Sequence, residues 1–149
     1  MIIYIGADHR GFEFKGKIIK ILNDLNLKVV DAGSYDSQKM CDYPKIALKV
    51  ANLVVKNKNN RGLLVCMSGI GQAIAANKVK GAYAALCNNV ESAKLSRQHN
   101  NANILVLGSK FVKQRELKKI IYTFLTTEFE GGRHQRRVNQ IKKMENCKP

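Results

Sequence analysis

A cysteine lies at the end of a short apolar run and directly before a glycine-containing turn. Cys66 closes the run 62–66 and is followed by Met67 and Ser68. A strand that leads into a helix places such a thiol beside backbone N–H groups, where the pKa of a cysteine can fall below its ordinary value. A thiolate there could remove a proton bound to carbon. We therefore expect proton-transfer chemistry at Cys66, and an inert buried thiol is the alternative.

Backbone donors for an oxyanion lie in the same turn. Gly69, Ile70 and Gly71 precede a helical stretch over 72–78. Glycine lets main-chain N–H groups approach an anion closely, and donors aimed at a developing oxyanion stabilise the transition state. The turn partly resembles a nicotinamide-cofactor fingerprint, but Ile74 stands at its third glycine position and no ribose-binding acid follows the next strand. We therefore expect no cofactor.

Apolar patterning predicts the elements that position this turn. Short apolar runs without polar alternation predict strands at 2–5, 28–30, 63–66, 83–86 and 104–107. Helical spacing of apolar residues predicts helices at 14–25, 46–54, 72–78, 89–97 and 117–125. Such strands separated by helices form a parallel sheet covered on both faces. We predict a doubly wound, Rossmann-like α/β fold with a five-stranded parallel sheet, three αβα layers and an extra C-terminal helix, as one domain over 1–149.

Ligands of open parallel sheets bind beyond the carboxyl ends of the strands. Polar candidates follow four of the predicted strands there: Asp8 and His9, Cys66 and Ser68, Asn88, and Gly108 and Lys110. Taken singly, Asp8 could merely cap a helix and His9 could be a surface residue. Because all of these residues are predicted to lie at the same edge of the sheet, a binding site is favoured there.

The last helical segment has two distinct sides. Its apolar stripe of Val138, Ile141 and Met144 is too narrow for a core helix. We therefore expect this stripe to pack on a partner subunit. On the charged side, Arg133 and Arg137 are i, i+4 neighbours, and the two guanidinium groups could close on one anion.

The chain carries 26 lysine and arginine residues against 11 acidic ones, a formal net charge of +15. Such a charge is compatible with nucleic-acid binding. Most of the lysines, however, interleave with apolar residues at helical spacing, as on solvated helix faces. We expect no nucleic-acid partner, and a non-catalytic, basic nucleic-acid-binding protein is the alternative from another functional class.

Neither a membrane span nor a metal site is expected. No apolar run approaches the ~20 residues that cross a bilayer. The histidines are far apart in the sequence and form no HExxH or i, i+4 pair: His9, His99 and His134. The cysteines show no CxxC spacing: Cys41, Cys66, Cys87 and Cys147. A chain of this kind fits the reducing cytoplasm.

Separate motifs along nearly the whole chain resemble those of the ribose-5-phosphate isomerase B family, in the same order. They are the segments 8–11, 42–44, 66–71, 75–78, 95–100 and 130–138. Two positions depart from the pattern common in that family: Met67 stands in place of a glycine, and Lys110 in place of an arginine. Lysine offers a point charge where arginine offers a planar fork.

The resemblance implies a metal-independent aldose–ketose isomerase of the pentose phosphate pathway. Members interconvert ribose 5-phosphate and ribulose 5-phosphate through a cis-enediolate. Some members accept allose 6-phosphate, and related subunits isomerise galactose 6-phosphate, so a hexose-6-phosphate isomerase is an open alternative. Family sites form between two subunits, which implies a homodimer or a homotetramer with shared active sites.

The resemblance also implies roles for individual residues. Cys66 matches the base that moves the proton, and Ser68 with the amides of 69–71 matches the oxyanion-binding group. His99 matches the residue that opens the furanose ring. The expected partners of the sugar hydroxyls are Asp8, Asp42 and Asn100. The expected phosphate ligands are His9, Arg133 and Arg137. Tyr43 and Lys110 are expected to bound the substrate pocket and to influence sugar preference.

Overall fold

A computed structural model describes residues 1–146 and confirms the predicted fold class. Within these residues one parallel sheet has the strand order β2-β1-β3-β5-β4. The strands are β1 (Ile3–Ala7), β2 (Val29–Asp31), β3 (Arg61–Cys66), β4 (Ala84–Leu86) and β5 (Ile104–Gly108). Cys147 lies outside the described residues.

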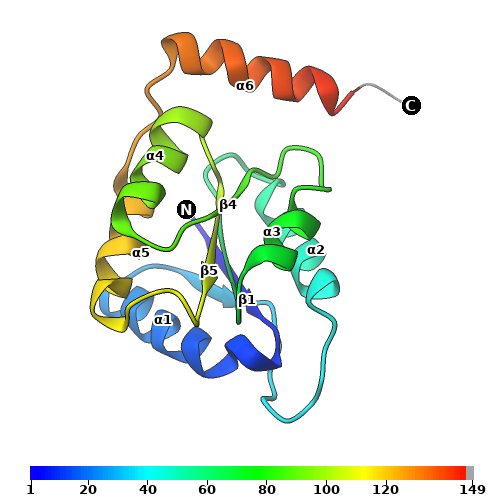
Figure 1. Ribbon diagram of the computed structural model, residues 1–149, viewed down its shortest axis with the longest axis vertical. Coiled ribbons are helices and arrows are strands. Elements are labelled where there is room, and N and C mark those ends of the chain that lie inside the picture. The colour runs from blue at the N-terminus through cyan, green and yellow to red at the C-terminus, as the bar shows by residue number, and fades with distance from the viewer. Residues whose placement is uncertain (147–149) are drawn as a thin grey trace.

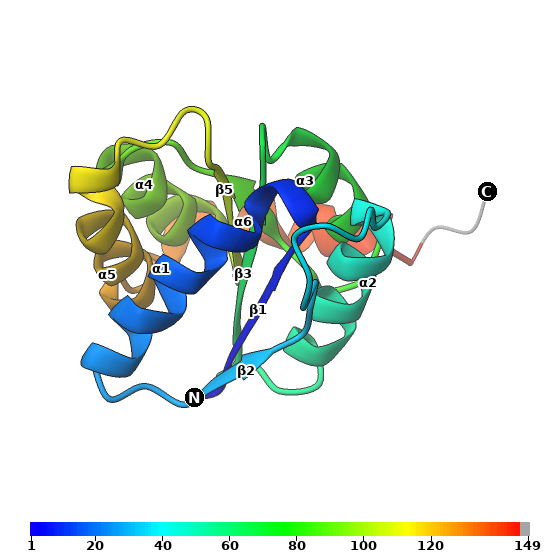
Figure 2. The same ribbon diagram turned by 90° about the horizontal axis from the view of Figure 1, so that it is seen from below.

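Helices cover both faces of this sheet (Figures 1 and 2). One face carries α1 (Phe12–Asp24), α4 (Val90–Asn100) and α5 (Leu117–Thr126). The other face carries α2 (Tyr43–Val54) and α3 (Ile70–Ala76). The 3₁₀ turns are η1 (His9–Gly11) and η2 (Gln114–Glu116), and α6 (Gly132–Met144) follows α5. None of the described helices has the length and apolar character needed to span a membrane.

Alternation along the central strands divides the core in two. Ile5, Leu63 and Leu105 face α1 and α5, whereas Leu64 and Val106 face α2 and α3. These side chains are fully buried. Since successive strand residues point to opposite faces, only uninterrupted apolar runs can fill both layers. This explains why the strand runs were recognisable in the sequence.

Some element boundaries differ from the prediction. Strand β1 continues past Ile5 to Ala7, because its ladder with β3 continues to the pair Ala7 and Val65. Helix α3 begins at Ile70 rather than at 72, directly after a left-handed Gly69. Helix α4 continues to Asn100, where Asn101 closes it with a positive φ of 50°.

Helix α6 lies across the amino ends of the strands, at the top of Figure 1. Its last turn is tied to the segment before β4, since Glu145 accepts hydrogen bonds from the Gly81 amide at 3.1 Å and from the Tyr83 hydroxyl at 3.4 Å. Within the apolar stripe Val138 is buried, but Ile141 and Met144 are 40% and 70% exposed. One chain therefore leaves part of this stripe uncovered.

Candidate active site

The thiol of Cys66 is hydrogen-bonded to a buried carboxylate. Because β1 and β3 are parallel neighbours paired as far as Ala7 and Val65, the next residues, Asp8 and Cys66, meet at the carboxyl edge. Cys66 Sγ lies 2.8 Å from Asp8 Oδ2, and Asp8 Oδ1 accepts from the Gly11 amide at 2.9 Å. Asp8 therefore caps η1 through Oδ1 and accepts the hydrogen bond of the Cys66 thiol through Oδ2.

The expectation of a lowered pKa for Cys66 is wrong for this arrangement. Burial raises the pKa of the thiol above its ordinary value, and the hydrogen bond and negative charge of Asp8 raise it further. The amides of Gly69 and Met67 act in the opposite direction. Helix α3 also has only two turns, so its dipole is too short to outweigh a carboxylate in contact. This arrangement favours the protonated thiol.

The turn after Cys66 has the close backbone approach expected of an oxyanion site. Gly69 has a φ of +80°, and a Cβ there would lie 2.6 Å from Leu86 Cδ1. A Cβ on Gly108 would lie 2.6 Å from the Ser68 carbonyl oxygen, so the loop after β5 packs directly on this turn. Ser68 Oγ lies 3.4 Å from the Ile70 amide. The amides of Met67 and Gly69 therefore lie near the thiol, and the Ser68 hydroxyl belongs to the same turn.

Met67, which replaces a glycine common in the family, fits this turn without a left-handed conformation. The non-glycine residues of positive φ in the described chain are Asn26 and Asn101. The Met67 side chain is 40% exposed, and its sulfur accepts a hydrogen bond from Arg10 Nη1 at 3.4 Å. The substitution therefore leaves the backbone donors in place.

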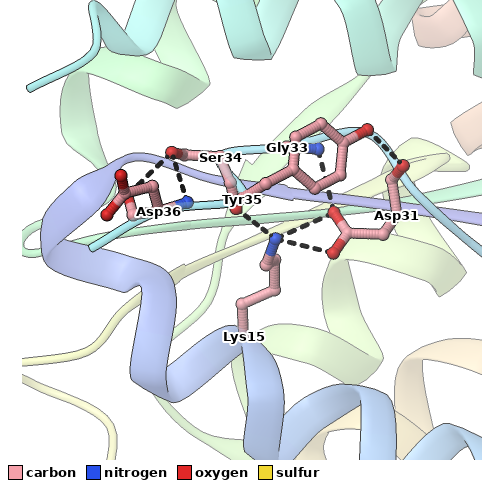
Figure 3. A network of polar contacts seen from close by, with 6 residues as sticks. All are labelled: Lys15, Asp31, Gly33, Ser34, Tyr35 and Asp36. Atoms are coloured by element: carbon pink, nitrogen blue, oxygen red, sulfur yellow. Dashed lines mark hydrogen bonds and ion pairs between the residues drawn. The ribbon is translucent and has the colours of Figure 1, made fainter. Parts of the chain in front are cut away.

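A buried ion pair fixes the strand end that carries Asp8 (Figure 3). Lys15 of α1 is 2% exposed, and its Nζ donates to the two carboxylate oxygens of Asp31 at 2.8 and 2.7 Å and to the Ser34 carbonyl. The loop it holds pairs with β1, since the Ala7 amide donates to the Gly33 carbonyl at 2.7 Å. Three acceptor oxygens offset the cost of burying the Lys15 ammonium. Lys15 thereby holds the loop whose Gly33 carbonyl accepts from Ala7, the residue before Asp8.

Other predicted residues lie along the same carboxyl edge. Tyr43, at the start of α2, packs against the turn, because a Cβ on Gly71 would lie 2.5 Å from its ring. Asp42 is exposed and pairs with Lys45 at 3.3 Å. The exposed Lys110 donates its amide to the Met67 carbonyl at 3.1 Å. Two buried atoms near this edge, His9 Nδ1 and Asn88 Oδ1, have no partner within residues 1–146.

The remaining predicted residues lie at the opposite, amino edge of the sheet. Helix α4 starts beyond the carboxyl end of β4 and runs back, so His99 and Asn100 at its last turn lie beside α6. Arg133 and Arg137 are exposed in the first turns of α6. A single chain therefore carries both sets of site residues, on opposite edges.

His134 was not among the residues predicted for the site. Its ring is 5% exposed and stacks on His99, with centroids 4.2 Å apart and planes 4° from parallel. Glu130 Oε2 lies 3.4 Å from His134 Nε2 and 3.9 Å from His99 Nε2. Burial and the neighbouring His99, Arg133 and Arg137 charges lower the pKa of His134, with Glu130 opposing them. Its place in the motif at 130–138 was the available signal.

This cluster contains the ligand types of a metal site, which the separation of the histidines in the sequence had concealed. The ligand atoms of His99, Glu130 and His134 lie within 4.8 Å of one another. Parallel rings, however, direct their in-plane lone pairs along separate planes, and Arg133 Nε lies 3.4 Å from His134 Nε2. The two imidazole nitrogens therefore do not converge on one ion as the ligands of a tetrahedral metal site do.

Comparison with known proteins gives matches over nearly the whole chain. A protein-family model described as Ribose/Galactose Isomerase matches residues 3–141. The ribose-5-phosphate isomerase B of Escherichia coli (strain K12) is 41% identical over 143 residues, which are 96% of this chain and 95% of that protein.

Solved structures are equally similar. Ribose-5-phosphate isomerase B from Mycoplasma genitalium, with bound ribulose-5-phosphate, superposes with a TM-score of 0.94 at 44% identity, covering 99% of this chain and 97% of that one. The Clostridium thermocellum ribose-5-phosphate isomerase B superposes with a TM-score of 0.94 at 42% identity, covering 98% of both chains.

Proposed function

Because the chain belongs to the Ribose/Galactose Isomerase family, we propose that it interconverts D-ribose 5-phosphate and D-ribulose 5-phosphate through a cis-enediolate. The observation that carries this proposal is the Cys66 thiol, 2.8 Å from Asp8 and beside the amides of Met67 and Gly69. A relative 44% identical to this chain holds ribulose-5-phosphate in its solved structure.

Cys66 is the base of the reaction. After His99 has opened the furanose ring, the thiolate removes the proton from C2 and the negative charge develops on the C1 carbonyl oxygen. Ser68 and the amides of Gly69 to Gly71 stabilise that oxyanion. The hydroxyl proton of O2 then passes to O1, and Cys66 returns the carbon-bound proton to C1 as the C2 carbonyl forms, so atoms and charge balance. No step requires a metal or a cofactor.

Asp8 controls when the thiolate forms. Its carboxylate accepts the hydrogen bond of the thiol and raises the pKa of Cys66, which favours the proton on sulfur. A sugar hydroxyl that donates to Asp8 Oδ2 takes over that hydrogen bond, and the thiol then releases its proton to solvent, while the amides of Met67 and Gly69 stay near Sγ. Phosphate-binding arginines from a partner subunit add positive charge, which favours a thiolate.

Asp8→Asn is expected to make Cys66 several-fold more reactive toward iodoacetamide near neutral pH, because loss of the carboxylate lowers the thiol pKa and raises the thiolate fraction. The rate is measured by mass spectrometry of the Cys66 peptide, with Cys41 as an internal reference. Asp42→Asn, which removes an exposed carboxylate, is the matched control and should leave the rate unchanged. An equal or slower rate in folded Asp8→Asn would contradict the assignment.

We further propose that the active site is shared between two subunits. Cys66, Asp8 and Ser68 come from the carboxyl edge of one subunit, and His99, Asn100, Arg133 and Arg137 come from the amino edge of its partner. The support is their placement on opposite edges of one chain, together with the exposed apolar residues Ile141 and Met144. His9 joins the two arginines on the phosphate. The assembly is a homodimer, or a homotetramer built from two such dimers.

Purified protein is expected to turn over ribose 5-phosphate with a higher kcat/KM than allose 6-phosphate or galactose 6-phosphate. The rates are compared in one coupled assay, and exhaustive chelation should leave them unchanged. A preference for either hexose phosphate would establish the hexose-6-phosphate isomerase alternative, with Tyr43 and Lys110 as the residues to exchange next.

The unpaired thiols Cys41, Cys66 and Cys87 suit the cytoplasm, where we place the enzyme.

A further inference from the structure

A cavity of about 600 Å³ opens at the amino edge of the sheet. It lies between the end of α2, the turn before β4 and the last turn of α6. Four cationic side chains line it: Lys58, Arg61, Lys80 and Lys142. Arg133 and Arg137 of the proposed active site lie at the other end of α6. The cavity is therefore separate from the residues assigned to catalysis.

The positive charge of this cavity is not paired with carboxylates. None of its four cations takes part in an ion pair within residues 1–146. Arg61 Nη1 donates only to the carbonyls of Lys58 and Asn60, at 3.0 and 2.8 Å, and its buried Nε has no partner there. The lining also contains one carboxylate, Glu145, which accepts from the Gly81 amide and the Tyr83 hydroxyl, so four cations face one anion there.

Two amide side chains of the wall, Asn57 and Asn101, leave donors rather than acceptors available, whereas Asn146 donates to the Lys142 carbonyl and accepts from Lys80. Asn103 Oδ1 accepts from the Tyr83 amide at 2.8 Å, and Asn101 Oδ1 accepts from Arg97 Nη1 at 3.0 Å. Asn57 Oδ1 accepts from the Asn59 amide at 2.9 Å. The N–H₂ groups of Asn57 and Asn101 have no partner within residues 1–146, so they can donate to a ligand.

A buried arginine, Arg97, adds positive charge next to this cavity. Arg97 is 5% exposed, and it donates to the carbonyls of Thr127 and Ala102 and to Asn101, without a carboxylate partner. Burial, and then the charge of Arg61, lower the pKa of Arg97 to about 10. The two guanidinium groups thus repel each other through the cavity wall, and a bound anion would relieve that repulsion.

We propose that this cavity binds a small molecule that carries a diphosphate group. Its volume falls within the range of about 300–1,000 Å³ typical of small-molecule sites and exceeds the needs of a single phosphate. Arg61 Nη2, which makes no hydrogen bond within residues 1–146, can donate to one phosphate, and Lys80 and Lys142 supply point charges for the other. Binding at this cavity does not require the isomerase reaction proposed above.

Titration calorimetry of the full chain with inorganic pyrophosphate tests this site. Arg61→Met and Lys142→Met should each weaken binding about tenfold or more, as expected for the loss of a charge-assisted contact. Lys118→Met, an exposed lysine of α5, is the matched control and should bind as the wild type does. Both cavity variants should retain ribose 5-phosphate isomerase activity.

Two further arms separate the possible sources of binding. Arg137→Ala reports the active site, so pyrophosphate binding lost in Arg137→Ala but kept in Lys142→Met would overturn the proposal, as would no measurable binding to the wild type. Parallel titrations with ADP and orthophosphate distinguish a nucleoside diphosphate from free phosphate. Tighter binding of orthophosphate than of pyrophosphate would also contradict it. Lys142 is exposed on α6, so its variant tests the site even where Arg61→Met fails to fold.

Discussion

Cys66→Ala should abolish isomerisation while leaving the fold and the binding of the sugar phosphate intact. Removing a positioned base costs about 10²–10⁴-fold in rate. The thiol acts on the C2 proton in the transition state and makes no contact on which the phosphate end of the substrate depends. We therefore expect kcat to fall by this factor and KM to change little.

Deuterium incorporation from solvent at C1 of ribulose 5-phosphate measures the proton transfer itself. Wild type should exchange this proton, and folded Cys66→Ala should not. Cys41→Ala is the matched control, since Cys41 is also a partly buried free thiol but belongs to the loop before α2 rather than to the turn after β3. Exchange by Cys66→Ala at the wild-type rate would show that the base is elsewhere.

The parts of the fold that were predictable are those in which burial requires an apolar run. The β3 and β5 runs face helices on both sides, so their sequences carry the signal directly. The ends of elements depend on partners far along the chain. Strand β1 reaches Ala7 because β3 and the Gly33 loop supply its last hydrogen bonds, and neither is visible near residue 7.

The meeting of Asp8 with Cys66 followed from the rule that strand ends gather at one edge of a parallel sheet. The direction of the pKa shift did not follow, because it depends on how deeply the thiol is buried and on its hydrogen bond to Asp8. Charge type and spacing predict that two groups are neighbours, but only coordinates give the hydrogen bond. The same holds for the burial of Lys15 against Asp31.

The placement of His99 could have been predicted without coordinates. A helix that follows a parallel strand must return to the amino edge, so a residue in its last turn lies opposite the strand end. The stack of His99 on His134 was less accessible, since it depends on how α6 crosses that edge. This separation of the two sets of site residues is what makes the shared site testable.

Mixing two inactive variants should restore activity if the site is shared. In a dimer of Cys66→Ala with Arg137→Ala, one site carries both defects, and the other combines an intact Cys66 with the intact Arg137 of the partner subunit. Each parent, in contrast, has a defect in both of its sites. Random exchange of subunits between isologous dimers should therefore recover about one quarter of wild-type activity.

The variants are mixed in equal amounts, the subunits are exchanged by mild denaturation and refolding, and kcat/KM is measured at low ribose 5-phosphate, where loss of phosphate binding through Arg137 is most visible. A mixture of Cys66→Ala with Ser68→Ala is the matched control, because both residues come from the same edge and no hybrid site is intact. Recovery in the control equal to that in the test would mean that the edges do not combine as proposed. Subunit exchange is verified by native mass spectrometry. No recovery in the test would then mean that Cys66 and Arg137 do not combine across two subunits, which would contradict the shared site.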